Sequence, residues 1–237
     1  MVKVFGVLLE PFLQVLCPPL FQLMKSPNEM YRSDAVGTLA ELTANIGPAV
    51  AMYVPQLMPV ALAGMKDEDP ETRSNSVFFA GVLLQNAGMA GTQYYGQVLQ
   101  LLAPLFQDPS GLPNLTDNCC GCVARMIMTS INSVPVAQVL PVLLKHVPLR
   151  KDFAENKSVY PCIFHLINTS NAAIASNMSL LFSAFANSLG NTNVEMEFQQ
   201  QIASTAKGMW QQYPNEIQQV LGSLPQEQQE NLKKFLQ

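Results

Sequence analysis

Cysteine and histidine are the residue types in this chain whose spacing could carry chemistry. Three of the five cysteines lie within four positions, in the stretch NCCGC at 118–122. A further pair, Cys162 and His165, is spaced i, i+3 and would share one face of a helix, which amounts to half of a zinc site. Both patterns could describe a metal or redox site, so their meaning depends on the elements that carry them.

If residues 118–131 form a helix, the clustered thiols point to different sides of it. Cys119 and Cys120 fall on an apolar arc, whereas Cys122 falls at the edge of a polar arc. A tetrahedral metal needs its ligands on one side, and an i, i+1, i+3 set cannot supply them. We therefore interpret these cysteines, and Cys162, as small buried residues, with Cys122 alone able to contact a ligand. The sequence predicts no catalytic residue, metal or cofactor, and no enzyme.

Composition narrows the class of protein. Of 237 residues, 49% are hydrophobic and 13% charged, which allows a large core and excludes global disorder. The net charge is −4 without a Lys/Arg-rich run, which argues against a nucleic-acid partner and weakly favours basic ones. An odd cysteine count indicates reduced thiols. We interpret the apolar start as a buried helix rather than a signal peptide, and expect no membrane partner.

Apolar residues recur with helical periodicity along the chain, and no segment alternates as a strand would. Turn-forming stretches such as NIGP and DEDP separate the periodic segments, and connections this short imply antiparallel neighbours. Helices are predicted over 2–24, 29–46, 49–65, 70–87, 92–107, 115–131, 136–146, 154–168, 171–189, 194–212 and 225–236.

The helices form an internal repeat of about 40 residues. SPNEMYRSDAV (26–36) overlays DEDPETRSNSV (67–77), which places Arg32 on Arg73 at an offset of 41. Asparagines and interior prolines recur at related intervals; the asparagines are Asn75, Asn118 and Asn156, and the prolines are Pro18, Pro59, Pro104 and Pro141. A period near 40 with two helices per unit is typical of HEAT repeats, which build a continuous core by stacking.

The predicted fold is therefore an all-α HEAT-repeat α-solenoid, a right-handed superhelix of antiparallel helix pairs. We expect a single domain over 1–237, with a polar C-terminal cap that keeps the last repeat soluble. The expected repeats cover 1–46, 47–88, 89–132, 133–170 and 171–213, and the cap covers 214–237.

Three segments carry a resemblance to a known family. MKDEDPETRSNSVFFAGVLLQNAG (65–88), LPNLTDNCCGCVARMI (112–127) and VLPVLLKHVPLRKDFAENKSVYPCIFHLI (139–167) resemble C-terminal repeats of the importin-β (karyopherin-β) nuclear transport receptors. The resemblance implies the C-terminal portion of a longer receptor, found in cytoplasm and nucleus, whose absent N-terminal repeats would bind Ran-GTP. It also implies that the second helix of each pair lines a concave side, and that cargo is basic, histones included.

Cargo contacts are predicted from positions i, i+4 and i+7 of the second helices, which share a face. Asp34 and Glu41 would accept Lys or Arg, and the asparagines would bond the main chain of an extended peptide. Helix capping is the alternative for the asparagines. Arg125 is basic and does not fit a uniformly acidic groove. Its alternative role is a ladder of ion pairs with Asp117 or Glu155 of a neighbouring repeat. The predicted contacts are Asp34, Glu41, Asn75, Phe79, Asn118, Cys122, Arg125, Asn156 and Tyr160.

The acidic turn KDEDPE (66–71) could attract basic cargo or could simply be a solvated repeat turn. The expected function is a cargo-binding module of a nuclear import receptor that recognises a basic localisation signal and takes part in Ran-dependent import. The rival is a structural HEAT-repeat scaffold for complex assembly without a transport role. A helical-bundle enzyme would need a convergent polar pocket, and the sequence offers none.

Overall fold

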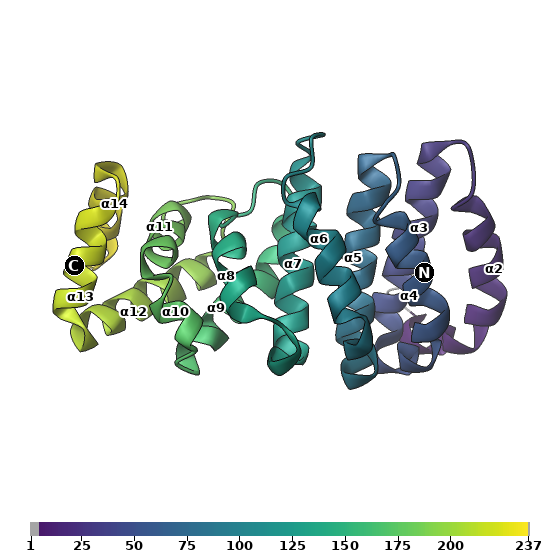
Figure 1. Ribbon diagram of the computed structural model, residues 1–237, viewed down its shortest axis with the longest axis horizontal. Coiled ribbons are helices and arrows are strands. Elements are labelled where there is room, and N and C mark those ends of the chain that lie inside the picture. The colour runs from purple at the N-terminus through teal and green to yellow at the C-terminus, as the bar shows by residue number, and fades with distance from the viewer. Residues whose placement is uncertain (1–4, 237) are drawn as a thin grey trace. The chain divides into compact units, whose positions relative to one another are not determined.

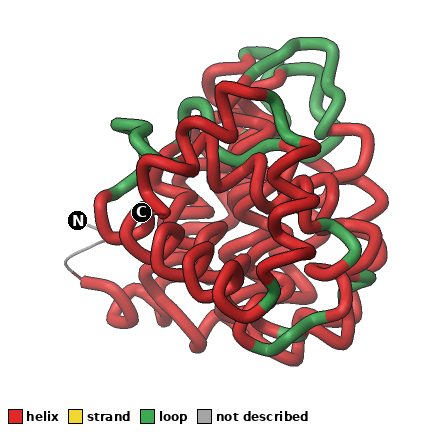
Figure 2. The backbone as a smooth tube through the Cα atoms, turned by 90° about the vertical axis from the view of Figure 1, so that its left-hand side faces the viewer, coloured by secondary structure: helices red, strands yellow, loops and turns green. Residues whose placement is uncertain are grey.

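A computed structural model describes residues 5–236 of the chain. Every regular element in this range is a helix (Figure 2), which confirms the all-α prediction for the described residues. The chain divides into two compact units, Met1–Val134 and Pro135–Gln237. The repeat boundaries expected from the sequence stay a prediction.

The first unit consists of helix pairs stacked side by side (Figure 1). Each pair contains a first helix with an interior proline and a longer second helix packed against it, and α5 lies between α3 and α7. The first helices are α2 (Leu13–Leu23), α4 (Val54–Gly64) and α6 (Tyr95–Leu105), and the second helices are α3 (Glu29–Ile46), α5 (Pro70–Ala87) and α7 (Pro113–Thr129). Short 3-10 helices are η1 (Gly6–Phe12), η2 (Gly47–Tyr53), η3 (Gly88–Tyr94) and η4 (Ile131–Ser133).

Local sequence explains where the second helices begin and end. Asn28 caps α3 by accepting from the Met30 N–H, and Asp69 caps α5 by accepting from the Thr72 N–H. Both helices end at a glycine with positive φ, Gly47 (70°) and Gly88 (57°), where other residues would be strained. The recurrence of cap and glycine in successive pairs reproduces the repeat seen in the sequence.

The second unit is also a helical stack. In it α11 contacts α8, α12, α13 and α14, and its aromatic residues Phe182 and Phe185 are fully buried. Its elements are α8 (Val136–Lys145), η5 (Phe153–Glu155), α9 (Asn156–Asn168), α10 (Ala172–Ala175), α11 (Met178–Ser188), α12 (Met196–Gln212), α13 (Pro214–Ser223) and α14 (Gln226–Leu236).

Three differences from the predicted helices have local causes. The predicted helix 2–24 begins outside the described residues, and its 6–12 portion is 3-10, because Gly6 turns the chain with φ of 49°. The predicted helix 171–189 breaks into α10 and α11 around Ser176 and Asn177. Helix α13 was not predicted, because Pro214 resembles a breaker although proline is favoured in a first turn.

Two helical stretches, Gly6–Leu23 and Glu29–Gly64, are long and apolar enough to cross a membrane by length and composition alone. Core helices of soluble proteins pass the same test, so this is weak evidence. The second stretch turns at Gly47, and both of its α-helices belong to the helix-pair stack.

Candidate functional site

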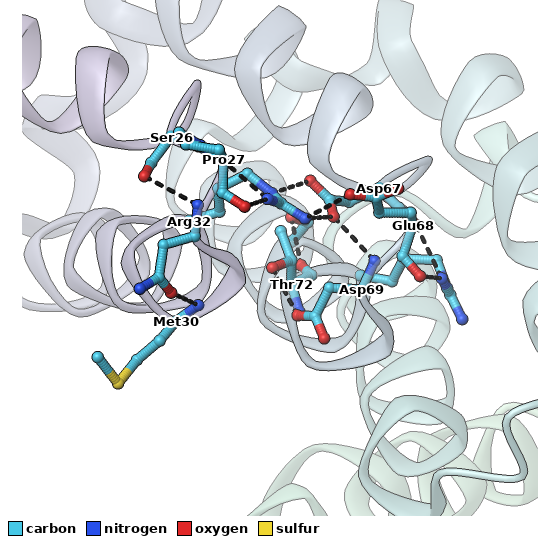
Figure 3. A network of polar contacts seen from close by, with 11 residues as sticks. Ser26, Pro27, Met30, Arg32, Asp67, Glu68, Asp69 and Thr72 are labelled. Atoms are coloured by element: carbon cyan, nitrogen blue, oxygen red, sulfur yellow. Dashed lines mark hydrogen bonds and ion pairs between the residues drawn. The ribbon is translucent and has the colours of Figure 1, made fainter.

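Two arginine–aspartate ion pairs join successive helix pairs of the first unit, and Figure 3 shows the first of them. Arg32 on α3 forms a bidentate ion pair with both carboxylate oxygens of Asp67, with Nε donating at 2.9 Å and Nη2 at 2.8 Å. Arg73 on α5 forms the equivalent ion pair with Asp108 through one carboxylate oxygen, with Nη2 donating at 2.9 Å. Both the arginines and the aspartates are 41 residues apart. The 41-residue offset between Arg32 and Arg73 in the sequence therefore reflects an ion pair that joins each helix pair to the next.

The pKa values of Asp67 and Arg32 are shifted by this ion pair. Partial burial favours the neutral carboxyl, but hydrogen bonds from Arg32 and from the backbone N–H of Asp69 outweigh it. The pKa of Asp67 consequently lies below its ordinary value, and that of Arg32 lies above, first because of its hydrogen bond to Asp67. The pair stays charged at neutral pH.

The acidic turn at 66–71 is thus mostly structural. Asp67 holds Arg32, and Asp69 caps α5, accepting from both the N–H and the hydroxyl of Thr72 at 2.7 Å. Glu68 reaches Arg32 only at 3.4 Å and its side chain is 87% exposed, and Glu71 is exposed. In this turn, Glu68 and Glu71 are the acidic side chains that are exposed and could attract basic groups.

The predicted asparagines tie neighbouring helices together and do not cap them. Asn75 donates from Nδ2 to the Ser33 hydroxyl at 2.9 Å, and Asn118 donates to the Ser74 hydroxyl at 3.1 Å. Asn156, in the second unit, donates to the Asn193 carbonyl at 3.0 Å and to Glu195 at 2.9 Å. The capping alternative is wrong, and each amide N–H₂ is already bonded within the protein.

Five of the predicted cargo contacts are buried. Phe79, Cys122, Tyr160 and Asn156 are 0% exposed and Asn118 is 4% exposed, so the prediction that they touch cargo is wrong for this arrangement of helices. A Cβ added to Gly81 would lie 3.1 Å from the Cα of Cys122, which places that cysteine against α5. The Tyr160 hydroxyl shares a 2.8 Å hydrogen bond with Ser188, and burial raises the pKa of Tyr160 to about 12.

All five cysteines are reduced and buried. Burial raises the pKa of Cys162 to about 12 and that of Cys119 well above its ordinary value, so both stay neutral thiols. A neutral thiol is neither a metal ligand nor a nucleophile. Within residues 5–236, no three His, Cys, Asp or Glu residues cluster as a metal site would require. The NCCGC stretch serves close packing of α7.

Two predicted contacts, Asp34 and Glu41, lie exposed on α3. Arg125 on α7 is 8% exposed and places its guanidinium carbon 5.3 Å from the centre of the Phe78 ring on α5. The ladder of Arg125 with Asp117 or Glu155 stays a prediction. Sequence reasoning missed Phe78 because it placed the open face one residue later, at Phe79; the half-buried Phe78 is the one that stays accessible.

We define the second-helix face as the open side of α3, α5 and α7. It offers carboxylates, one cation–aromatic pair and one thioether, a chemistry that suits a peptide with basic and apolar side chains. Its members are Glu41, Glu71, Phe78, Gln85, Arg125 and Met128.

Comparison with known proteins gives consistent relatives, although no family model matches the chain. Human importin-4 is 31% identical over 205 residues, covering 86% of this chain and 19% of the relative. The probable importin subunit beta-4 of Schizosaccharomyces pombe is 28% identical over 206 residues, and mouse importin-4 is 28% identical over 232 residues, 98% of this chain. The chain spans about a fifth of the length of these relatives.

Solved structures show the same architecture. The karyopherin Kap121p bound to the SUMO protease Ulp1p matches with a TM-score of 0.68 at 17% identity, covering 95% of this chain and 21% of that one. A designed armadillo repeat protein matches with a TM-score of 0.56 at 17% identity, covering 92% and 98%. These likenesses identify an all-α HEAT-repeat solenoid. Together with the importin relatives that cover 86–98% of its length, they show that the chain belongs to the importin-β (karyopherin-β) family.

Proposed function

We propose that this chain is the cargo-binding part of a nuclear import receptor, and that it recognises a basic localisation signal such as a histone tail. The observation that carries the proposal is the similarity to importins along 86–98% of the chain. In this proposal the receptor acts in Ran-dependent import between cytoplasm and nucleus. Ran-GTP would bind N-terminal repeats, and the present repeats would lie in the C-terminal portion.

The second-helix face is where we place the cargo. Its exposed carboxylates on α3 and α5, Glu41 and Glu71, can accept Lys or Arg in charge-assisted hydrogen bonds. Asp34 is a third exposed carboxylate on α3. The overall charge of −4 adds a weak long-range attraction for a basic segment.

The middle of this face suits the rest of an extended peptide. Phe78 and Met128 offer apolar contact, and Gln85 is an exposed amide that can bond a peptide backbone. Arg125, held over Phe78, would disfavour a cargo lysine there and favour an acidic or aromatic side chain. The proposed signal is therefore basic at the α3 end and mixed toward α7.

A binding titration tests the proposal. We expect the intact chain to bind a fluorescently labelled histone-tail peptide with an affinity that falls as salt rises, because exposed charge pairs are screened. Glu41→Lys should weaken binding by about tenfold, since it replaces an attraction with a repulsion. The measurement is fluorescence anisotropy at several salt concentrations.

The matched control is Glu230→Lys, which makes the same charge change at an exposed position on α14 of the second unit. It should leave the affinity within about twofold, because only the overall charge changes. If the helical, folded chain shows no binding even at low salt, the import proposal is wrong and a scaffold role is favoured. Equal losses for the two variants would place the cargo outside the second-helix face.

A further inference from the structure

The turn between α2 and α3 contains the one place in the sequence where proline directly follows a serine or threonine, Ser26 followed by Pro27. Ser26 itself is half-buried, and the residues around it at 25 and 27–29 are exposed. Proline directly after the hydroxyl residue is the feature that proline-directed protein kinases require. The chain on both sides of this serine is therefore accessible to such an enzyme.

Ser26 occupies the position at which the two following turns carry aspartate. Ser26, Asp67 and Asp108 follow one another at intervals of 41 residues. Each side-chain oxygen accepts the backbone N–H of the residue two positions on, at 3.1 Å for the serine and at 2.9 Å for both aspartates. The three turns thus share one local geometry. The first of them has a neutral hydroxyl where the other two have an anion.

An arginine of the same helix pair already bonds the backbone at this position. Nη1 of Arg32 donates to the Ser26 carbonyl at 3.0 Å, just as Nη1 of Arg73 donates to the Asp67 carbonyl at 2.8 Å. Figure 3 shows the Arg32 guanidinium bonded to the Ser26 turn on one side and to Asp67 on the other. An anion on the Ser26 side chain would therefore be carried by a residue that Arg32 already contacts.

We propose that Ser26 is a phosphorylation site for a proline-directed kinase, and that the phosphate draws Arg32 away from Asp67. In the transfer, the Ser26 hydroxyl oxygen forms a bond to the γ-phosphorus of ATP, and the bond between that phosphorus and the oxygen bridging to the β-phosphate breaks. The hydroxyl proton passes to a base of the kinase, and ADP leaves. This inference is independent of the cargo proposal.

Charge decides which anion holds Arg32 after the modification. Phosphoserine carries a charge of about −1.5 to −2 at pH 7 and offers three strong acceptor oxygens, whereas Asp67 carries a single negative charge. The phosphate also repels Asp67 and the neighbouring Glu68, because like charges at close range disfavour one another.

The consequence for the helix stack follows from where the three residues lie. Ser26 and Arg32 belong to the first helix pair, α2 and α3, whereas Asp67 lies in the turn between α4 and α5 of the next. The phosphate thus replaces an ion pair between two helix pairs with one inside the first. Phosphorylation of Ser26 loosens the link between these helix pairs, and its removal restores the link.

Phosphate incorporation tests the site itself. The folded chain is incubated with Mg-ATP and a mitogen-activated protein kinase, and mass spectrometry of the intact chain and of its peptides counts and locates the phosphate. We expect one phosphate per chain at Ser26, and loss of incorporation in Ser26→Ala and in Pro27→Ala, both checked for helical fold by circular dichroism. No incorporation into the folded natural chain, or incorporation only at other residues, would overturn the proposal.

A chain made with phosphoserine at position 26 tests the effect on Arg32 without a kinase. In the unmodified chain, Asp67→Asn should raise the unfolding equilibrium constant of the first unit about fivefold, because Arg32 loses its anionic partner. With phosphoserine at position 26, the same substitution should change this constant by less than about twofold, since the phosphate already holds Arg32. Urea unfolding followed by circular dichroism measures both.

Phosphoserine at position 204 is the matched control, because Ser204 is exposed on α12 of the second unit. It adds the same charge far from Arg32 in sequence, and Asp67→Asn should keep its cost of about fivefold there. An equal cost of Asp67→Asn with and without phosphate at position 26 would show that Arg32 stays with Asp67, and the proposed release would be wrong.

Discussion

At the scale of single residues, the polar side chains with the shortest bidentate hydrogen bonds bind groups of a neighbouring repeat. The bidentate pair of Arg32 and Asp67 shows this, because its side chains are only 9% and 16% exposed and both are fully engaged. Such a pair fixes the distance between successive helix pairs. Its energetic contribution depends on the charge of Asp67 and so on pH.

Replacing Asp67 by asparagine tests this residue directly. The folded pKa of Asp67 is lowered, so its stabilising charge is present above the unfolded pKa of about 3.9 and is lost as the pH falls through the folded value. At pH 7 we expect Asp67→Asn to reduce the free energy of unfolding of the first unit by about 1 kcal/mol, allowing for solvent screening. As the pH falls below about 4 and through the lowered folded pKa, the difference from the natural chain should shrink progressively.

Urea unfolding monitored by circular dichroism at pH 7 and pH 3 gives both values. Glu68→Gln is the control, because its carboxylate is 87% exposed and reaches Arg32 only at 3.4 Å, and it should be neutral at either pH. A destabilisation by Asp67→Asn that persists unchanged at pH 3 would contradict the charge argument.

At the scale of elements, successive second helices are tied by polar side chains that reach backbone and hydroxyl groups one repeat earlier. Asn86 and Asn45 occupy equivalent positions on α5 and α3, yet only Asn86 bonds the neighbouring helix. The same residue type at the same register therefore stabilises the stack in one case and only its own helix in the other.

This difference predicts unequal costs for the same substitution. Asn86→Ala should lower the free energy of unfolding of the first unit by about 1 kcal/mol, because the Thr43 carbonyl loses a partner. Asn45→Ala should be neutral to within about 0.5 kcal/mol, since alanine also favours the helix. Hydrogen exchange of α3 and α5 amides measures both variants, and equal costs would show that the cross-helix bond adds no stability.

The sequence predicted the elements better than the faces they present. The helical periodicity and the turn-forming residues between helices predicted α3 and α5 with the bounds observed, 29–46 and 70–87. The choice between Phe78 and Phe79 as the open position could not follow from a wheel, because neighbours on both sides cover α5. A wheel describes one helix, whereas burial in a stack depends on which helices precede and follow it.

At the scale of the whole chain, the solenoid fold and the importin-β family are established, and the import role is our proposal. The stack of second helices in the first unit provides a continuous surface, which fits recognition of an extended segment. On this account one side of each second helix builds the solenoid, and only its open side is left for cargo.

The most direct test of the central claim is to locate a bound basic peptide on the chain. A photo-crosslinking residue at Gln85, on the second-helix face, is compared with one at Met52, which is 73% exposed in η2. The account predicts that a histone-tail peptide crosslinks at Gln85 and not at Met52, and that high salt abolishes the product. Crosslinking at Met52 alone, or equally at both positions, would contradict it.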